Sequence, residues 1–290
     1  MSSFKITLIC PAHNEEFNLD PLINSINHQT RKPDEVIFIE DSSTDETYNV
    51  LKNFQLNNKN VKIFRVKNKN ISKNRNFAIK KSKGEIIVCV DAGCKLENNY
   101  LEKIINPFNK REISFVGGIS KISPKNLFDK CFSFFVEKNK LSKTYLPKGH
   151  AMAFRKDLWK KVGGFPENLA LGAEDTFFGK KAISIGFKPF IVHDAFVYWE
   201  TRSNLMVIFK QFKSYGYWDA KAFNFFKLPL KSKLNLLISI LFPLSILHSI
   251  YMGFKCFNYC KNIKSLYYGI TIDLSKIYGY SFGWIKGIIL

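Results

Sequence analysis

Two apolar runs, each ending in polar residues, stand near the start of the chain. Residues 6–15 read ITLICPAHNE, and residues 36–45 read VIFIEDSSTD. Each run is short, rich in apolar and β-branched side chains, and turns polar only at its end, which is typical of a strand buried on both faces. We therefore expect both runs to be strands of one sheet, with their polar ends at its carboxyl edge.

Further apolar runs recur through the first 120 residues, with helical spacing between them. Strands are expected at Ile6–Cys10, Val36–Ile39, Val61–Phe64, Ile86–Val90 and Ile113–Val116. Between the first two runs, apolar residues of the segment 19–26 recur at i, i+3, i+4 and i+7, as in an amphipathic helix. Ser43 and Glu46 match a capping box that would open the next helix. This alternation predicts an α/β fold with a mostly parallel sheet flanked by helices.

The composition narrows the class of protein. The chain has 290 residues, of which 46% are hydrophobic, and this excludes a disordered, collagen-like or disulfide-scaffold protein. It carries 44 Lys and Arg against 24 Asp and Glu, a formal net charge of +20, and 15% of its residues are aromatic. Such a balance suits three kinds of partner: nucleic acid, an anionic membrane, or phosphorylated small molecules.

The C-terminal part differs from the rest in composition. Residues 203–290 contain eleven Lys and two acidic residues, and residues 234–254 carry no charge but are interrupted by Pro243. That stretch is long enough to span a bilayer at about 1.5 Å per residue, and an in-plane hairpin and a soluble core helix are the alternatives. Lysines on both sides favour both ends being cytoplasmic, and hence a re-entrant or surface-lying element. We expect the α/β domain at residues 1–220 and membrane-associating helices at residues 221–290, at the cytoplasmic face of an anionic membrane.

The six cysteines are scattered, and no CxxC pair exists. This usage fits a reducing cytosolic compartment. Cys256 and Cys260 are spaced for a shared metal ion, but no second pair of ligands accompanies them, so the sequence alone disfavours a zinc site there.

Polar residues at the ends of three apolar runs mark the expected ligand-binding edge. They lie at residues 11–15, 40–45 and 91–93, and in open α/β sheets ligands bind at the carboxyl ends of the strands. Acids at such an edge can accept hydrogen bonds from a ribose or base, or hold a metal. No GxGxxG follows the first run and no GxxxxGK[ST] occurs, which disfavours a dinucleotide oxidoreductase and a P-loop NTPase.

Five segments, in order and at normal spacing, resemble family 2 glycosyltransferases. They are Ile6–Glu16, Val36–Thr47, Asn74–Asn76 with Lys83–Glu85 and Asp91, Phe154–Lys156 with Val162–Glu167, and Glu174–Asp175. The resemblance covers about residues 4–220. It implies a GT-A fold and inverting transfer from a nucleotide-diphosphate sugar to an acceptor hydroxyl. With the basic tail, it points to polysaccharide biosynthesis on a lipid-linked or other saccharide acceptor.

The resemblance also assigns roles to residues. Asp175, with Glu174 beside it, would supply the general base that takes the proton of the acceptor hydroxyl. Asp41 would bond the base edge of the nucleotide, and Arg75 would lie near the base or phosphates. The nucleotide-sugar site as a whole would comprise Pro11, Ala12, Asn14, Glu15, Asp41, Arg75, Asp91, Ala92 and Gly93.

One position departs from the family pattern. The usual metal motif is Asp-x-Asp, and here Gly93 replaces the second Asp after Asp91. Either Asp91 holds Mn²⁺ or Mg²⁺ with a remote ligand, for which His193 is the candidate, or cationic side chains neutralise the departing diphosphate instead. His150, Trp199 and Arg202 are candidates for contacts with the acceptor or the diphosphate.

Three alternatives remain open at this point. A basic nucleic-acid-binding protein is disfavoured, and no nucleic acid is expected, because the basic residues are spread along the chain without an RRM, KH or zinc signature. A nucleotidyltransferase lacks its usual Gly-rich first loop, because residues 11–14 stand there instead. The third alternative is an inactive, glycosyltransferase-like binding protein.

Overall fold

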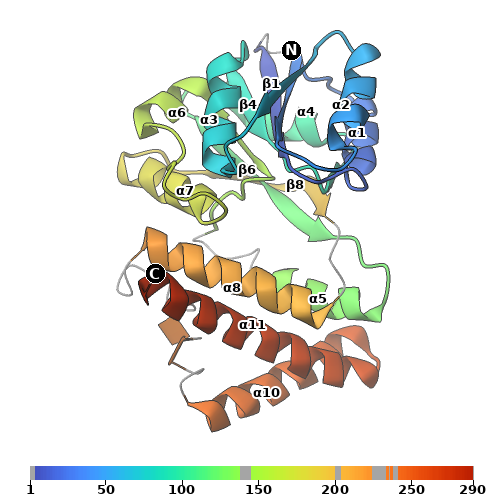
Figure 1. Cartoon of the computed structure of the whole chain (residues 1–290), viewed down its shortest axis with the longest axis vertical. Helices are drawn as coiled ribbons and strands as arrows, with labels where there is room; N and C mark the ends of the chain where they lie inside the picture. Colours follow the sequence, from blue (N-terminus) through green and yellow to red (C-terminus); the bar gives the residue numbers. More distant parts are fainter. Residues whose placement is uncertain are drawn as a thin grey trace. The chain divides into compact units, whose positions relative to one another are not determined.

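The structure is a computed structural model that describes residues 4–137, 145–199, 204–223, 233–234, 236–237 and 241–289. The chain forms two compact units (Figure 1). The first comprises Met1–Lys121, Thr144–Ala170 and Glu174–Trp199, and the second comprises Ile122–Lys143, Leu171–Ala173 and Glu200–Leu290. The sheet belongs to the first unit, and the second unit is built from helices.

The sheet of the first unit has the strand order β3-β2-β1-β4-β7-β6-β8-β5. Its strands are β1 (Ile6–Ala12), β2 (Glu35–Asp41), β3 (Val61–Val66), β4 (Ile86–Cys89), β5 (Cys94–Leu96), β6 (Phe115–Ile122), β7 (Met152–Arg155) and β8 (Phe190–Trp199). Strands β3, β2, β1 and β4 pair in parallel. Strand β7 is antiparallel to β4 and β6, and β5 is antiparallel to β8. The α/β prediction is confirmed, with parallel pairing among the first four strands and a mixed sheet beyond them.

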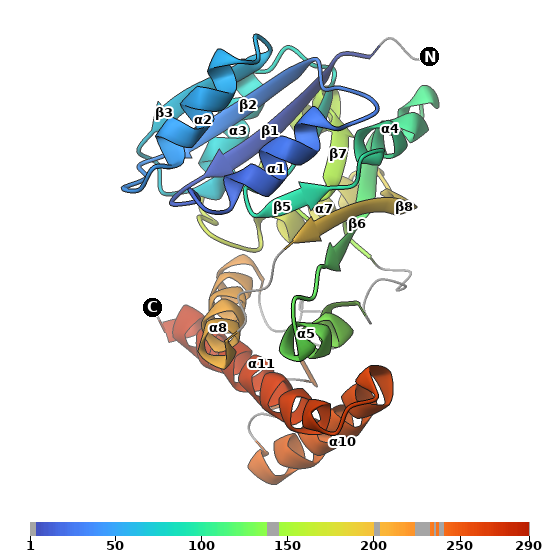
Figure 2. The same ribbon diagram turned by 90° about the vertical axis from the view of Figure 1, so that its right-hand side faces the viewer.

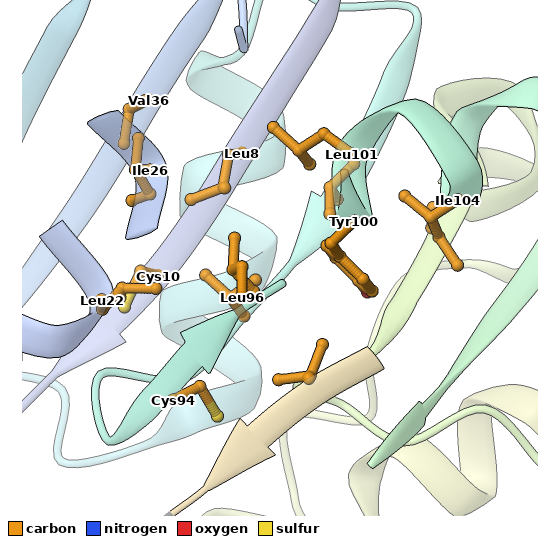
Figure 3. Packing of buried hydrophobic residues seen from close by; sticks show 14 of the residues in the cluster. Leu8, Cys10, Leu22, Ile26, Val36, Cys94, Leu96, Tyr100, Leu101 and Ile104 are labelled. Carbon is orange, nitrogen blue, oxygen red and sulfur yellow. The ribbon is translucent and has the colours of Figure 1, made fainter. Parts of the chain in front are cut away.

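Helices cover both faces of this sheet. They are α1 (Leu19–Asn27), α2 (Thr47–Leu56), α3 (Ile71–Lys81), α4 (Tyr100–Ile105), the short 3₁₀ helix Asn106–Asn109, α6 (Lys156–Val162) and α7 (Glu174–Ser184). Successive side chains of β1 point to opposite faces of the sheet. Helix α1 lies on one face of the sheet and helix α3 on the other (Figure 2). Leu8 and Cys10 pack with Leu22 of α1 (Figure 3), whereas Ile9 packs with Ile79 of α3. Both faces of the central strands are therefore buried, as the apolar runs predicted.

The capping box expected at Ser43 and Glu46 is wrong. Helix α2 begins at Thr47, and its N-cap residue Glu46 makes no side-chain cap hydrogen bond. Ser43 Oγ instead accepts a hydrogen bond from the Asn14 backbone N–H at 3.1 Å. The polar side chains after β2 thus join the ends of two parallel strands, which places them at the ligand-binding edge of the sheet.

The second unit contains α5 (Leu127–Glu137), α8 (Leu205–Ala222), α10 (Phe242–Cys260) and α11 (Lys264–Ile289). Helices α8 and α11 lie side by side (Figure 1). Glycines 279, 283 and 287 of α11 allow this close approach, because a Cβ at Gly279 would lie 2.6 Å from the Phe209 carbonyl oxygen of α8. A Cβ at Gly287 would lie equally close to the Tyr217 carbonyl oxygen.

The uncharged stretch 234–254 is only partly described. Helix α10 begins within it at Phe242, with Pro243 in its first turn, and positions 235 and 238–240 lie outside the described residues. In the described part of the chain, no helix combines the length and apolar character needed to cross a bilayer. The domain boundary at residue 220 stays a prediction, and α8 belongs to the second compact unit.

Candidate active site

A buried arginine joins two acidic residues that are far apart in sequence. Arg75 of α3 is only 1% exposed. Its Nη2 donates to Asp91 Oδ1 at 2.8 Å, directly after β4, and its Nη1 donates to Glu174 Oε1 at the start of α7. The guanidinium thereby links the expected donor side of the site, at Asp91, to the expected acceptor side, at Glu174.

The loop before β7 closes over this arginine. A Cβ at Gly149 would lie 2.6 Å from Arg75 Nη2, so only a glycine fits against the guanidinium. The Gly149 N–H also donates to Asp175 Oδ2 at 2.9 Å. One residue therefore covers Arg75 and orients the carboxylate that follows Glu174.

The neighbouring carboxylates Glu174 and Asp175 differ in their pKa values. Burial, together with the adjacent Asp175, raises the pKa of Glu174 to about 7 despite its ion pair with Arg75. Burial also acts to raise the pKa of Asp175, but the charge of Lys148 and the Gly149 N–H outweigh it and hold that pKa below its ordinary value. Glu174 is buried and Asp175 is half-buried. The pair thus offers one ionised, more accessible carboxylate and one that titrates near neutrality.

His150 lies on the other side of Asp91. Its Nε2 is 2.5 Å from Ser120 Oγ of β6, and its Nδ1 is 3.8 Å from Asp91 Oδ2. Its ring centroid is 6.5 Å from that of Trp199, the last residue of β8. Burial lowers the pKa of His150, so the neutral imidazole predominates at neutral pH. A neutral imidazole can accept a hydrogen bond or ligate a metal.

Asp41, at the end of β2, is held by the segment that leads into α3. It accepts hydrogen bonds from the backbone N–H groups of Asn68 and Asn70 and from Asn74 Nδ2, at 2.8, 3.3 and 2.8 Å. Burial acts to raise its pKa, but these bonds hold the pKa below its ordinary value. The carboxylate is therefore ionised and fixed, and it shapes the loop beside the strand ends.

The segment after β1 is fixed to the segment after β2. Asn14 has a positive φ of 54° and its side chain accepts from the Thr44 N–H at 2.9 Å. The Glu15 N–H donates to Thr47 Oγ1 at 2.7 Å, and His13 Nδ1 is 2.6 Å from the Asp41 carbonyl oxygen. Pro11 and Ala12 are still part of β1. These contacts set the backbone of the expected nucleotide site without any Gly-rich loop.

The other residues predicted for the site are Ala92, Gly93, His193 and Arg202. Ala92 is buried, and a Cβ at Gly93 would meet nothing within 4 Å, so this glycine leaves open space beside Asp91. His193 is exposed on β8, and no contact with Asp91 is found for it among the described residues. Arg202 lies outside the described residues.

Two contributors escaped the sequence reading. Ser120 bonds His150, and Lys148 lowers the pKa of Asp175. A lone serine at the end of a strand carries no signal. Lys148 directly precedes Gly149 and His150, and that Lys-Gly-His run is the clue that could have found it.

The residues around Asp91 fit a divalent cation. Asp91 Oδ1 is engaged by Arg75, while Oδ2 faces the neutral His150 Nδ1 at 3.8 Å. A carboxylate oxygen and an imidazole nitrogen suit Mn²⁺ better than Mg²⁺, which prefers oxygen ligands, when a diphosphate and water complete the coordination. The open space at Gly93 leaves room on the same side.

Comparisons with known proteins define the class. The model of the glycosyl transferase family 2 matches residues 7–167, which is more than half of the chain. The structure also resembles a mannosyltransferase from Pyrobaculum calidifontis in complex with GDP-Man and Mn²⁺. That likeness has a TM-score of 0.65 at 17% identity and covers 95% of this chain and 87% of the other. These matches define a GT-A fold carrying a family 2 sequence.

The chain belongs to glycosyl transferase family 2. It is 26% identical over 198 residues to the glycosyltransferase AglE of Haloferax volcanii, covering 65% of this chain and 64% of that protein. It is 28% identical over 204 residues to the O-antigen chain rhamnosyltransferase WbaN of Salmonella anatum, covering 65% and 63%. The chain thus spans slightly under two thirds of the length of these relatives. The family assignment disfavours the nucleic-acid-binding and nucleotidyltransferase alternatives.

The raised pKa of Glu174 predicts a pH-dependent stability. A folded-state pKa above the unfolded value stabilises the fold at low pH, and that contribution is lost as pH rises through about 7. The free energy of unfolding of the wild type, minus that of Glu174→Gln, should fall by about 2–3 kcal/mol between about pH 5 and 8. Urea unfolding at each pH measures this difference.

Asp175→Asn is the matched control, because the pKa of Asp175 is shifted the other way. Its contribution to stability is present above the unfolded pKa of about 4 and is lost only below it, so the difference between the wild type and Asp175→Asn should stay constant between about pH 5 and 8 and fall in acid. Equal slopes for the wild type and Glu174→Gln would contradict the assignment of Glu174.

Proposed function

We propose that this chain is an inverting glycosyltransferase that moves a sugar from a nucleotide-diphosphate sugar to the hydroxyl of a saccharide acceptor, in polysaccharide biosynthesis. The observation that carries the proposal is the buried Arg75, which bonds Asp91 and Glu174 together. Such a link sets the distance between a diphosphate-binding edge and a pair of carboxylates. Inverting transfer needs that arrangement, because the acceptor oxygen must attack C1 opposite the departing diphosphate.

Asp175 is the general base in this proposal. It is ionised, half-buried and oriented by the Gly149 N–H. A sugar hydroxyl is a poor nucleophile, so a carboxylate within hydrogen-bond reach must take its proton as the bond to C1 forms. Glu174 is a positioning residue, because its carboxylate accepts a hydrogen bond from the buried Arg75.

The donor nucleotide would lie against the ends of β1, β2 and β4. In this proposal Asp41 bonds the base edge of the nucleotide, and its hydrogen bonds from residues 68–74 hold the carboxylate ionised at that edge. The backbone of residues 11–15 forms the adjoining wall. Arg75 is buried and bonds an acid at each Nη atom, so we assign it to the organisation of the site rather than to direct phosphate binding.

A divalent cation would be held by Asp91 and His150. When bound, it neutralises the charge that develops on the departing diphosphate. The residues of the chain hold Asp91 ready for this: Arg75 fixes one oxygen of the carboxylate and leaves the other facing His150. The prediction that named His193 as a ligand stays a prediction, and the variants below test both histidines.

Asp175→Asn should lower kcat by about 100-fold or more, because it removes the base but keeps the shape of the side chain. Nucleotide-sugar binding should stay within about twofold of wild type, as measured by the ligand-induced rise in Tm. Asp157→Asn, at an exposed carboxylate of α6, is the control and should keep wild-type turnover. Near-normal turnover in Asp175→Asn would reject the base assignment. Nucleotide-sugar binding without turnover in the wild type would support an inactive binding protein.

Activity should be lost in EDTA and restored by Mn²⁺. His150→Ala should raise the Mn²⁺ concentration for half-maximal activity by roughly 10- to 100-fold, since it removes one of two protein ligands. His193→Ala serves as the comparison and should leave that concentration unchanged. Electron paramagnetic resonance of bound Mn²⁺ gives a second readout. Full activity in EDTA would exclude the metal, and the opposite ranking of the two variants would move the ligand to His193.

We further propose that the second unit binds an anionic membrane surface and that the acceptor is lipid-linked, which places the enzyme at the cytoplasmic face. Helix α10 supports this proposal because large apolar side chains lie on its exposed face. Its exposed face is apolar, with Leu244, Leu247, Tyr251 and Phe254 each about half exposed or more. These positions follow helical spacing and form one stripe, which is typical of a helix lying in a lipid interface.

The buried side of α10 carries polar as well as apolar residues. Ser249 Oγ donates to the buried Asp273 of α11 at 2.9 Å, and His248 Nε2 lies 3.6 Å from the same carboxylate. Close glycine-mediated packing and polar contacts between helices, with apolar residues outside, are features of helices that lie in lipid. The eleven lysines of residues 203–290 would add roughly 1 kcal/mol each when near anionic headgroups. These features support residues 221–290, together with α8, as the membrane-associating part.

Leu247→Glu should weaken binding to phosphatidylglycerol vesicles by about 10-fold or more, because it removes an apolar contact and adds a like charge at the lipid surface. Leu56→Glu, at an equally exposed leucine of α2 in the first unit, should bind as the wild type does. Vesicle co-sedimentation measures both, with phosphatidylcholine vesicles as the neutral comparison. Equal binding by the two variants, or none by the wild type, would contradict the proposal.

A further inference from the structure

Three cysteines from two helices of the second unit meet in one place. Cys131 of α5 and Cys256 and Cys260 of α10 have Sγ atoms that all lie within 4.8 Å of one another. The Sγ atoms of Cys131 and Cys260 are 3.7 Å apart. In the described part of the chain, this is the one group of three such potential metal ligands that converge.

The fold holds the three thiols in place. Cys256 and Cys260 lie one turn apart on α10 and therefore share a face of the helix. Helix α11 packs tightly behind them, because a Cβ at Gly269 would lie 2.8 Å from Cys256 Cβ. Cys131 and Cys256 are fully buried, and Cys260 is 7% exposed. The cluster is thus built into the contact between helices and is not formed by mobile side chains.

The spacing of the sulfur atoms matches a metal–thiolate centre. A Zn–S bond is about 2.3 Å, so two thiolates of a tetrahedral centre lie about 3.8 Å apart, and two of a trigonal centre about 4.0 Å apart. The 3.7 Å between Cys131 and Cys260 is close to both values. An ion at the centre of the three sulfur atoms would require little movement of the helices.

We propose that Cys131, Cys256 and Cys260 bind one soft d¹⁰ metal ion through three thiolates. Zn²⁺ would take a water as its fourth ligand, and Cu⁺ would be three-coordinate. Binding replaces three S–H bonds with three metal–sulfur bonds and releases three protons to solvent, with no change of oxidation state. Thiolates select such ions over Mg²⁺ and Mn²⁺, so this site is chemically independent of the one at Asp91.

One end of the cluster is accessible to solvent, since Cys260 is 7% exposed. Cys260 is the last residue of α10, where Lys261 takes a positive φ of 57° and ends the helix. This partly exposed end is the route by which an ion and its water ligand reach the sulfur atoms.

The ion would join α5 to α10. Because a metal bound only by the folded state adds its binding free energy to stability, it would hold together helices that are distant in sequence. The sequence disfavoured a site at Cys256 and Cys260 because the third ligand lies in another helix, where spacing rules do not reach.

The test uses the full chain, reduced and stripped of metal by a chelator under anaerobic conditions. Zn²⁺ and Cu⁺ are titrated separately against chromophoric competitors, and Co²⁺ reports thiolate ligation by its sulfur-to-metal charge-transfer band. We expect one ion per chain, a raised Tm, and affinity weakened ~100-fold or more in Cys131→Ser, with loss of the Co²⁺ band. Cys94→Ser, at a buried cysteine of β5 outside the cluster, should keep the stoichiometry and affinity of the wild type. Tighter competition by one of the two ions identifies which is bound.

A second measurement serves if Cys131→Ser does not fold. Alkylation of the native wild type, followed by peptide mass spectrometry, should show metal-dependent protection at Cys131, Cys256 and Cys260 and no metal-dependent change at Cys94. Absence of binding by either ion, unchanged affinity in a folded Cys131→Ser, or no metal-dependent protection would overturn the proposal. A Cys131–Cys260 disulfide in the protein as isolated from cells would also overturn it.

Discussion

The buried guanidinium of Arg75 is the interaction on which the candidate site depends. A charge that is 1% exposed is tolerated only when it is paired, and here Asp91 and Glu174 supply that pairing from two distant segments. Removing either acid would leave a buried charge unbalanced, so the strand β4, the helix α3 and the start of α7 must keep one arrangement. Gly149 belongs to the same constraint, since any larger residue would displace the guanidinium. The geometry of donor and acceptor sides is thus set by electrostatics in the core.

Much of the first unit could be predicted from the sequence, because its strands are buried on both faces and read as apolar runs. The acids at the strand ends, and the pairing of Glu174 with Asp175, followed from the family resemblance. The capping prediction failed because the partner is distant in sequence: Ser43 bonds Asn14 rather than capping α2. Local spacing carries no information on the partner of a polar side chain. For the same reason the family resemblance could place Arg75 near the base or phosphates, but only the fold shows it bonded to Asp91 and Glu174.

Both units bury apolar side chains, but the second also exposes an apolar helix face. In the first unit, apolar side chains such as Leu8 and Phe38 are fully buried and the acids gather at one edge. In the second unit, leucines and aromatics of α10 are exposed while Ser249 and Asp273 are buried against each other. Water as the only solvent would oppose that second arrangement, because exposed apolar area is costly and buried polar groups gain little. A lipid surface removes the first cost, because the exposed apolar side chains of α10 would then contact lipid instead of water. The proposed membrane binding therefore explains the basic, apolar composition of this unit better than the binding of a ligand does.

Gly93 replaces the second Asp of the family's metal motif, and this bears on the metal site proposed at Asp91. An Asp at this position would add a second negative charge beside Asp91, and Arg75 is already shared between Asp91 and Glu174. With glycine there, Asp91 is the only carboxylate at this motif and shares Arg75 with Glu174. Its second oxygen faces the neutral His150. An imidazole ligand brings no charge, so a cation bound by Asp91 and His150 would retain more positive charge toward a diphosphate than one bound by two carboxylates. Under the proposed function, such a cation would neutralise more of the charge on the departing diphosphate, and His150 rather than His193 lies adjacent to Asp91, as a shared ligand must.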